Sequence, residues 1–286
     1  MRNILLIFTL AMLLSISQGM LIRPDQINTS QPFPSILMDD DANISLDGGK
    51  IKNFRSEPDI GIRSFVQINK PTGRVMMRES SGEWACVGDV VLTSCCVLNS
   101  ENIVGFNSSG ACWKWNGEEW MMLSDSPVLG KCSIGSDGTL CAVASGNGLY
   151  KWDGDSWVSI GGAVVSLAVL DATHIYMVGA DHTTYGHLWM YDGETWVPLD
   201  TTTEIDSVSV AKDGSLFAIL HSGGLSKWAG TAWGSSLGGV IKAIAAKSGT
   251  MVWVVGADDT LWYWNGLTWT QSDPGIAVSD ISISNF

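Results

Sequence analysis

Two stretches of the chain decide the fold: Leu149-Tyr150-Lys151-Trp152-Asp153-Gly154-Asp155-Ser156-Trp157 and Leu261-Trp262-Tyr263-Trp264-Asn265-Gly266-Leu267-Thr268-Trp269. Both place an aromatic residue, a polar residue with glycine, and a closing tryptophan in the same order. The closing tryptophan recurs at intervals of 36, 37, 39, 37 and 36 residues, as Trp84, Trp120, Trp157, Trp196, Trp233 and Trp269. A regular period of this length predicts tandem structural repeats, with these tryptophans as packing anchors.

Two further positions follow the same period. Three residues before the anchor the chain has glycine in five repeats: Gly117, Gly154, Gly193, Gly230 and Gly266. Five residues before it the same repeats carry an aromatic residue: Trp115, Trp152, Tyr191, Trp228 and Trp264. The first repeat has Ser81 and Glu79 at these positions and is therefore degenerate.

Each repeat reads as four short strands, as the repeat anchored at Trp233 illustrates. Segment 205–210 has β-branched residues and alternates apolar with polar positions, and segments 215–220 and 225–228 follow as the second and third strands. Glycine turns separate the three, and Trp233 opens a fourth strand. A repeat of this length made of four strands is typical of a β-propeller blade. The sequence shows no sustained helical period.

The two ends of the repeat array complement each other. Segment 65–68 matches the second strand of a repeat but has no first strand before it, whereas segment 280–284 has the first-strand pattern and no repeat of its own. Pairing the two would remove two open sheet edges. We therefore predict an all-β, six-bladed propeller of four-stranded blades over residues 61–286, closed by pairing of the C-terminal strand with the N-terminal blade.

The motifs at 149–157 and 261–269 resemble tectonin repeats, and the resemblance extends from Ile62 to the C-terminus. Tectonin-type proteins, which include tachylectin-related and fish-egg lectins, are propellers that bind glycans at several equivalent sites. The resemblance thus implies a lectin-like, carbohydrate-binding protein whose partners are glycans or glycoproteins. The same repeats also occur in interaction scaffolds, so fold alone does not fix the function.

Glycan binding needs aromatic surface and nearby hydrogen-bond donors. The position seven residues before the anchor supplies the aromatic candidates Trp113, Tyr150, Trp189 and Trp262, and the next position supplies Lys114, Lys151 and Lys227. The alternative is that these aromatic side chains are buried packing residues and the lysines are solvated. In that case the protein is a structural subunit of an extracellular coat, fibre or matrix.

The N-terminal region predicts export. Arg2, the apolar run 4–14 and Ser17-Gln18-Gly19 form a signal-peptide pattern over residues 1–19. The run is too short for a membrane span. Residues 20–60 read as an irregular, acidic arm that could mediate self-association. Three sequons, at Asn28, Asn43 and Asn107, are candidate N-glycosylation sites.

Six cysteines fall in one part of the chain: Cys86, Cys95, Cys96, Cys112, Cys132 and Cys141. In an exported protein they indicate disulfides, for which fifteen pairings exist. Cys132 and Cys141 flank a turn at 136–138, which favours a bridge between them. Zinc is the alternative, although the paired spacing of a zinc site is lacking.

Other classes of function are disfavoured. A net charge of −13 without a basic cluster argues against nucleic acid. The four histidines occupy different repeat positions, no catalytic motif is present, and Asp153, Asp192 and Asp213 sit in Asp-Gly turn signatures. We therefore expect no enzymatic activity, no cofactor and no metal.

Overall fold

The computed structural model describes residues 65–78, 82–180, 185–272 and 276–284, together with three short strands nearer the N-terminus. The chain divides into two units, Met1–Ser56 and Glu57–Phe286. In the first unit β1 (Ile36–Met38), β2 (Ile44–Leu46) and β3 (Gly49–Lys50) form an antiparallel sheet. These three short strands lie within the segment 20–60 that the sequence analysis describes as an arm. The predicted signal peptide, Asn28 and Asn43 lie outside the described residues.

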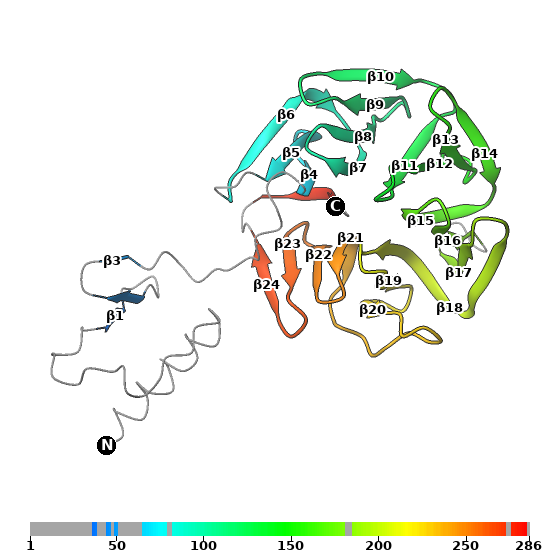
Figure 1. Ribbon diagram of the computed structural model, residues 1–286. Helices are drawn as coiled ribbons and strands as arrows, with labels where there is room; N and C mark the ends of the chain where they lie inside the picture. Colours follow the sequence, from blue (N-terminus) through cyan, green and yellow to red (C-terminus); the bar gives the residue numbers. More distant parts are fainter. Residues whose placement is uncertain are drawn as a thin grey trace, which may run out of the picture. The chain divides into compact units, whose positions relative to one another are not determined.

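The second unit is a ring of antiparallel sheets, which we call blades, with each inner strand at the centre of the ring and each outer strand at its rim (Figure 1). The first blade consists of β25 (Val278–Ile283), β4 (Phe65–Asn69), β5 (Arg74–Arg78) and β6 (Trp84–Val91). The second consists of β7 (Ser94–Asn99), β8 (Asn102–Phe106), β9 (Cys112–Trp115) and β10 (Trp120–Ser124). The third consists of β11 (Leu129–Ile134), β12 (Leu140–Ala144), β13 (Leu149–Trp152) and β14 (Trp157–Gly161).

The fourth blade has six strands: β15 (Val164–Asp171), β16 (His174–Gly179), β17 (Gly186–Tyr191), β18 (Trp196–Val210), β19 (Leu216–Leu220) and β20 (Leu225–Lys227). The fifth contains β21 (Ile241–Ser248), β22 (Met251–Gly256), β23 (Leu261–Trp264) and β24 (Trp269–Ser272). The all-β propeller is thus confirmed, with four-stranded blades everywhere except in the fourth. No helix occurs in the described part of the chain, and none of it could span a membrane as a helix.

The described residues form five blades, and the prediction of six is wrong. The cause is β18, whose 15 residues run without a break from the rim of one repeat to the inner position of the next. Where the repeats anchored at Trp120, Trp157, Trp233 and Trp269 have glycine or proline at this crossing, β18 has threonine at 201–203. β-Branched residues favour the extended backbone and let the strand continue.

The same blade lacks the strand expected at Trp233. Trp233 pairs with Trp228 only through an isolated bridge. The residues that follow include Gly234 and the pair Gly238 and Gly239, which both have positive φ values, of 103° and 83°. A backbone in this region cannot continue a regular strand.

Closure of the ring by the C-terminal strand is confirmed. In the register of β25 with β4, Ile281 lies opposite Gln67 and Ile283 opposite Phe65. The closing strand also bonds to the second blade, because the amide of Val97 donates to the Ser282 hydroxyl at 3.1 Å. The last strand therefore links two blades.

The turn before each anchor explains the recurrent Asp/Asn-Gly pair. The Asp153 carboxylate accepts hydrogen bonds from the amides of Asp155 at 2.9 Å and Ser156 at 2.8 Å. Gly154 has a φ of 115°, a conformation that favours glycine. The turn brings Trp152 and Trp157 opposite each other, with ring centroids 5.3 Å apart. The interpretation of Asp153 as a turn residue is confirmed.

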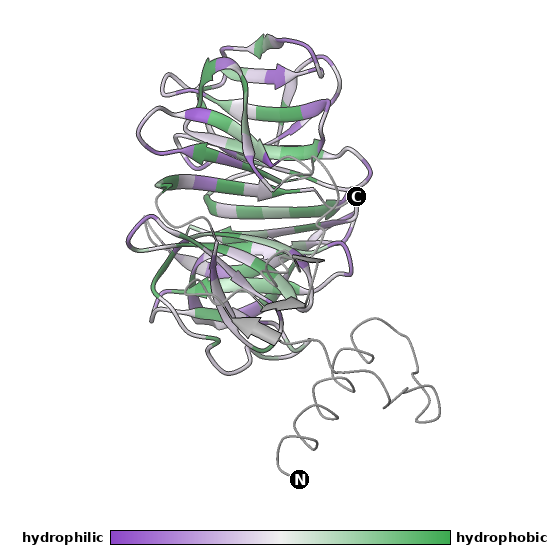
Figure 2. Ribbon diagram, turned by 90° about the vertical axis from the view of Figure 1, so that its left-hand side faces the viewer, coloured by the Kyte–Doolittle hydropathy of each residue, from purple (hydrophilic) through white to green (hydrophobic). Residues whose placement is uncertain are grey.

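The core lies between the blades. Hydrophobic residues are frequent along the strands (Figure 2), and apolar side chains pack against the neighbouring sheet. One cluster, for example, joins Cys96 and Val104 of the second blade to Leu129 and Leu140 of the third. Three anchors add a hydrogen bond from the indole nitrogen to the preceding repeat: Trp120 to the Val87 carbonyl, Trp233 to Asp200 and Trp269 to the Leu237 carbonyl.

Candidate functional site

The aromatic candidates lie on the third strands of four different blades. Trp113 is in β9, Tyr150 in β13, Trp189 in β17 and Trp262 in β23. The structure therefore does not bring them together in a single site. Any binding through these residues would use separate, repeated positions around the ring.

Three of the four aromatic candidates contribute to interblade packing. Trp113, Tyr150 and Trp262 are partly buried against hydrophobic clusters. The Trp262 indole donates to the Thr260 hydroxyl at 2.7 Å, and the buried Trp113 indole nitrogen has no partner among the described residues. Trp189 is partly exposed and lies outside the hydrophobic clusters that these residues form. It is thus the candidate most available to a ligand.

The lysine candidates do not complete sites with these aromatic residues. Neighbouring residues of a strand point to opposite faces, so Lys114 faces away from Trp113 and Lys151 away from Tyr150. The Lys227 ammonium is engaged within the protein, because it donates to the Gly249 carbonyl at 3.0 Å. The sequence analysis grouped these lysines with the aromatic residues because they are adjacent in the chain, but adjacent residues of a strand point to opposite faces.

A pocket of about 200 Å³ lies at the junction of the first and second blades. We call it the junction pocket. Its lining combines an indole, a carboxylate and a hydroxyl with apolar groups, and consists of Met77, Ala85, Cys86, Val87, Ser100, Glu101, Trp115 and Gly117.

The polar wall of the junction pocket is held in place by its turns. The Glu101 amide donates to the Asn99 side chain at 3.0 Å. Gly117, with a φ of 100°, lies so close to Glu101 that an added Cβ would come within 3.1 Å of its Cγ. The Trp115 ring lies 5.7 Å from that of Trp120. These contacts preorganise the pocket.

Sequence reasoning missed Glu101 and treated Trp115 as a packing residue. A signal for Glu101 exists in the repeat itself. The residue in contact with the turn glycine is Thr173 at Gly193 and Thr250 at Gly266, but Glu101 at Gly117. A carboxylate in place of threonine distinguishes this junction from the other two.

A second cavity, of about 290 Å³, is enclosed by the inner strands. Its lining includes many serines, but their hydroxyls already join neighbouring strands. The amides of Val169, Val208 and Ala246 donate to them at 2.9, 3.2 and 3.0 Å, the acceptors being Ser133, Ser166 and Ser209.

Asp280 is the acidic group of this inner cavity. Burial raises the pKa of its carboxyl to about 6, although hydrogen bonds from Ser94 and the amides of Cys95 and Ile281 oppose the rise. The amide of Cys95 donates to this carboxylate at 3.2 Å. Asp280 therefore serves the contact between the first and second blades.

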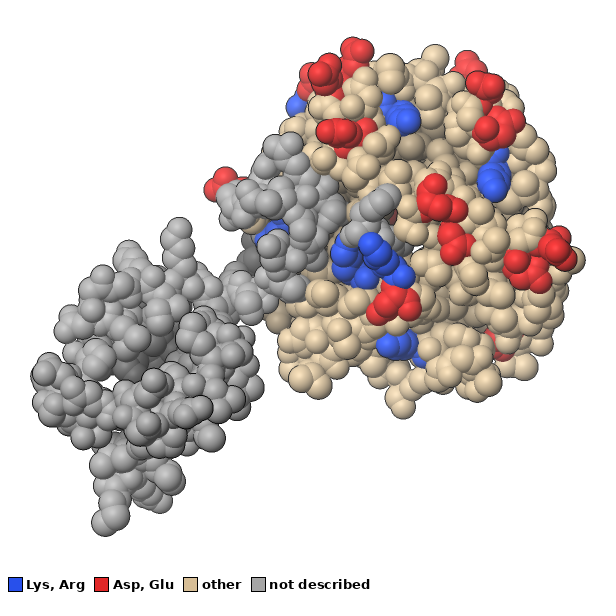
Figure 3. Space-filling model, in the orientation of Figure 1, with Lys and Arg blue, Asp and Glu red and all other residues tan. Residues whose placement is uncertain are grey.

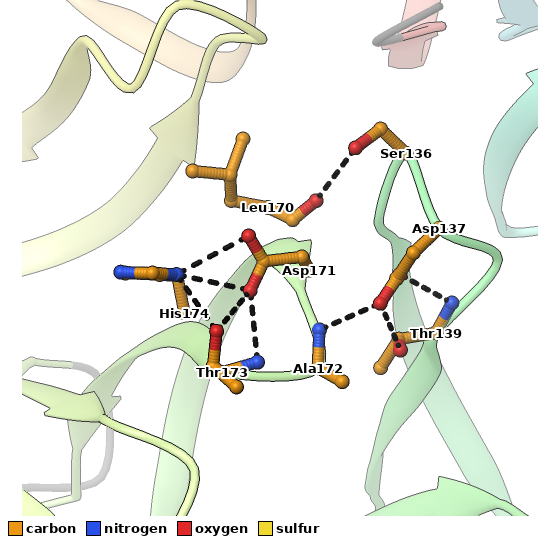
Figure 4. A network of polar contacts seen from close by, with 8 residues as sticks. All are labelled: Ser136, Asp137, Thr139, Leu170, Asp171, Ala172, Thr173 and His174. Atoms are coloured by element: carbon orange, nitrogen blue, oxygen red, sulfur yellow. Dashed lines mark hydrogen bonds and ion pairs between the residues drawn. The ribbon is translucent and has the colours of Figure 1, made fainter.

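Aspartate carboxylates in turns form hydrogen bonds to neighbouring blades at other junctions. In Figure 4 the Asp137 carboxylate accepts from the Thr139 amide at 2.9 Å and, across the junction, from the Ala172 amide at 2.8 Å. Asp213 repeats this contact with the Gly249 amide at 2.7 Å. These carboxylates are occupied by backbone donors, and no cluster of three or more metal-ligating side chains occurs in the described ranges.

Charged side chains are unevenly distributed on the face drawn in Figure 3. One group of lysine and arginine side chains lies near the centre of the ring, next to acidic side chains, and further acidic side chains lie toward the rim. One lysine at the inner strands, Lys247, donates to the Ser284 carbonyl at 2.6 Å. Burial lowers the pKa of Lys247, and the nearby Lys212 lowers it further.

All six cysteines are free thiols in the structure. A bridge between Cys132 and Cys141 is wrong, because Cys132 lies opposite Ala142 and Cys141 opposite Ser133. The two side chains are one register position apart and point to opposite faces of the third blade.

Of the three sequons, Asn107 lies among the described residues. Its side-chain oxygen accepts hydrogen bonds from the amides of Ser109 and Ala111 at 3.1 and 3.0 Å.

Comparison with known proteins extends only to the fold. No family model and no curated protein matches the sequence. Among solved structures, the WD40 propeller domain of Doa1 superposes with a TM-score of 0.54 at 15% identity, over 79% of this chain and 84% of that one. PorZ of Porphyromonas gingivalis gives 0.53 at 13%, over 79% of this chain and 35% of its own. YCF48 bound to D1 peptide gives 0.51 at 15%, over 76% and 80%. The fold is a β-propeller.

Proposed function

We propose that this protein is a secreted, non-enzymatic carbohydrate-binding propeller of the tectonin type, with the junction pocket as its principal glycan site. The observation that carries the proposal is the composition of that pocket, where Trp115, Glu101 and Ser100 converge between two blades. An indole offers apolar surface to the C–H face of a sugar ring. A carboxylate accepts hydrogen bonds from the hydroxyl groups of the sugar, and a serine hydroxyl can both donate to them and accept from them.

The size of the pocket supports a small ligand or the terminal unit of a glycan. A volume of about 200 Å³ is below the range of about 300–1,000 Å³ typical for drug-sized ligands. A single shallow site of this kind binds weakly, and additional sites on the same molecule raise the apparent affinity for multivalent glycans. Trp189, partly exposed on the fourth blade, is the additional site we propose.

The test is retention of the purified protein on a glycan array, followed by titration with the best monosaccharide. Glu101→Gln keeps the shape of the side chain but removes its charge, and we expect at least a tenfold loss of affinity from losing a charge-assisted hydrogen bond. The matched control is Glu118→Gln, since Glu118 is exposed and does not line the pocket. Glu118→Gln should bind as the wild type does.

Trp189→Ala tests the second site. It should weaken retention on multivalent glycans while leaving monosaccharide affinity at the junction pocket unchanged. Absence of binding across the array, or equal binding by the Glu101 and Glu118 variants, would refute the assignment of the pocket.

A scaffold role is the second candidate, and exposed apolar side chains on outer strands favour it. Val91 of β6 is 54% exposed, Met122 of β10 57% and Val158 of β14 45%. Exposed apolar surface on a rim suits binding to a protein partner, as YCF48 is bound to D1 peptide. Self-association is tested by size-exclusion chromatography of protein lacking residues 20–60. An unchanged elution position would rule out assembly through that segment.

A further inference from the structure

We infer that Cys96 and Cys132 are a redox-active pair whose oxidation by a low-molecular-weight disulfide covalently links the second blade to the third. Cys96 lies on the inner strand β7 and Cys132 on the neighbouring inner strand β11. Their side chains share one interblade hydrophobic cluster. The inference does not depend on the proposed glycan binding.

The junction between β7 and β11 differs from other junctions of the inner strands. Cys96, Ser133 and Ser209 each precede the anchor of their repeat by 24 residues. Ser133 and Ser209 accept a hydrogen bond from an amide of the next inner strand. At the position of Cys96 the chain has a thiol instead, which packs in the same interblade cluster as Cys132, whose own thiol donates to the Val104 carbonyl at 3.6 Å.

The other cysteines are separated from this pair by the fold. Cys95 faces the opposite side of β7 and packs against the first blade. Cys141 belongs to the next interblade cluster. Cys112 shares the cluster of the pair but lies on the third strand, β9. Cys112 is therefore the one competitor for Cys132.

The cavity enclosed by the inner strands gives an oxidant access to the pair. Both Cys96 and Cys132 line this cavity of about 290 Å³, and Cys132 is partly exposed while Cys96 is buried. Cys132 is therefore the thiol that reacts first, and Cys96 is the resolving thiol.

The reaction with glutathione disulfide is a two-step exchange. The Cys132 thiolate attacks one sulfur of glutathione disulfide, so a mixed disulfide forms and one glutathione leaves as the thiolate. The Cys96 thiolate then attacks the Cys132 sulfur and expels the second glutathione. Two protein thiols are oxidised, one glutathione disulfide is reduced to two glutathione molecules, and the two protons pass to the leaving thiolates.

The surroundings make this exchange slow at neutral pH. Burial raises the pKa of both thiols, and the negative charge of Asp280 raises them further. Because the thiolate is the nucleophile, the rate should increase with pH over the alkaline range.

The experiment treats the folded protein with glutathione disulfide and counts thiols after denaturation. Oxidised wild type should lose two of its six thiols, and peptide mapping under non-reducing conditions should join Cys96 to Cys132. Cys95→Ser and Cys112→Ser are the matched controls and should retain the link, whereas Cys96→Ser and Cys132→Ser should lose it. Comparing these four variants also distinguishes the adjacent Cys95 and Cys96.

Thermal unfolding gives a second measurement on the wild type alone. A link that closes a loop of this length should raise the Tm by roughly 10 °C relative to the reduced protein. A link from Cys132 to Cys112 or Cys95, a link that survives Cys96→Ser, or no loss of thiols after prolonged oxidation at alkaline pH would overturn the inference. Peptide mapping of the oxidised wild type identifies the linked cysteines even if a variant fails to fold.

Discussion

The indole nitrogen of Trp120 donates a hydrogen bond of 2.7 Å to the carbonyl oxygen of Val87. Trp120 opens the outer strand of the second blade, and Val87 lies in the outer strand of the first. The anchor tryptophan thus contributes both to its own turn and to the junction with the preceding blade. At this anchor the N–H group of tryptophan makes a contact that phenylalanine could not make.

Trp120→Phe should therefore destabilise the protein beyond the loss of packing. It removes the indole donor and leaves the Val87 carbonyl without this hydrogen bond, which costs about 1–3 kcal/mol. Urea unfolding followed by circular dichroism measures the change. The matched control is Trp157→Phe, because the buried Trp157 indole nitrogen has no partner among the described residues. We expect the control to be clearly less destabilised; equal losses would show that the hydrogen bond contributes little.

Deletion of β25 should open the ring. It would remove three buried side chains, Val278, Ile281 and Ile283, and expose the edge of β4. We expect loss of a cooperative transition, or a Tm lower by more than about 10 °C, as a loss of several kcal/mol predicts. A synthetic peptide covering residues 276–286 should restore stability when added in excess. Failure of the peptide, or an unchanged Tm after deletion, would contradict closure by this strand.

The local rules of the repeat could be predicted from the sequence because they depend on short-range chemistry. Asp153 and Gly154 announce a turn through hydrogen bonds within a few residues. The pairing of β25 with β4 was predictable for a related reason, since one strand lacked a partner at each end of the array.

Features set by tertiary geometry could not be predicted in the same way. The number of blades depends on whether β18 breaks at 201–203, a balance between strand propensity and the turn that a separate blade would need. The junction pocket combines Glu101 and Trp115 of the second blade with Met77 and Cys86 of the first, so the period alone does not reveal the pocket. The thiol pair likewise depends on which face of each inner strand a cysteine occupies.

The free energy of unfolding should depend on pH because of Asp280. Its pKa is raised to about 6 in the folded state, chiefly by burial, from an ordinary value near 3.8. The folded protein therefore binds the proton more tightly than the unfolded chain, so this group's stabilisation is present below about pH 4 and is lost as the pH rises through about 6. The loss is on the order of 3 kcal/mol.

Asp280→Asn isolates this effect, because asparagine stays neutral and can still accept from the Cys95 amide. At pH 8 the variant should be more stable than the wild type by up to about 3 kcal/mol, with the difference disappearing near pH 4. Urea unfolding at a series of pH values measures it. A difference that does not vary with pH would refute the titration of this carboxyl.

The turn glycines permit a test of backbone strain without steric conflict. Gly154 has a φ of 115°, yet a Cβ added there would meet no atom within 4 Å. Gly154→Ala should therefore cost about 1–3 kcal/mol through backbone strain alone. Gly162 is the matched control, because a Cβ there also meets nothing within 4 Å and its φ is not in the positive range. Gly162→Ala should be neutral or slightly stabilising, since it reduces the freedom of the unfolded chain. Thermal unfolding of the two variants measures the difference. Equal Tm values would mean that Gly154 does not adopt a strained conformation in this turn, and the recurrence of Asp-Gly pairs would then need another explanation.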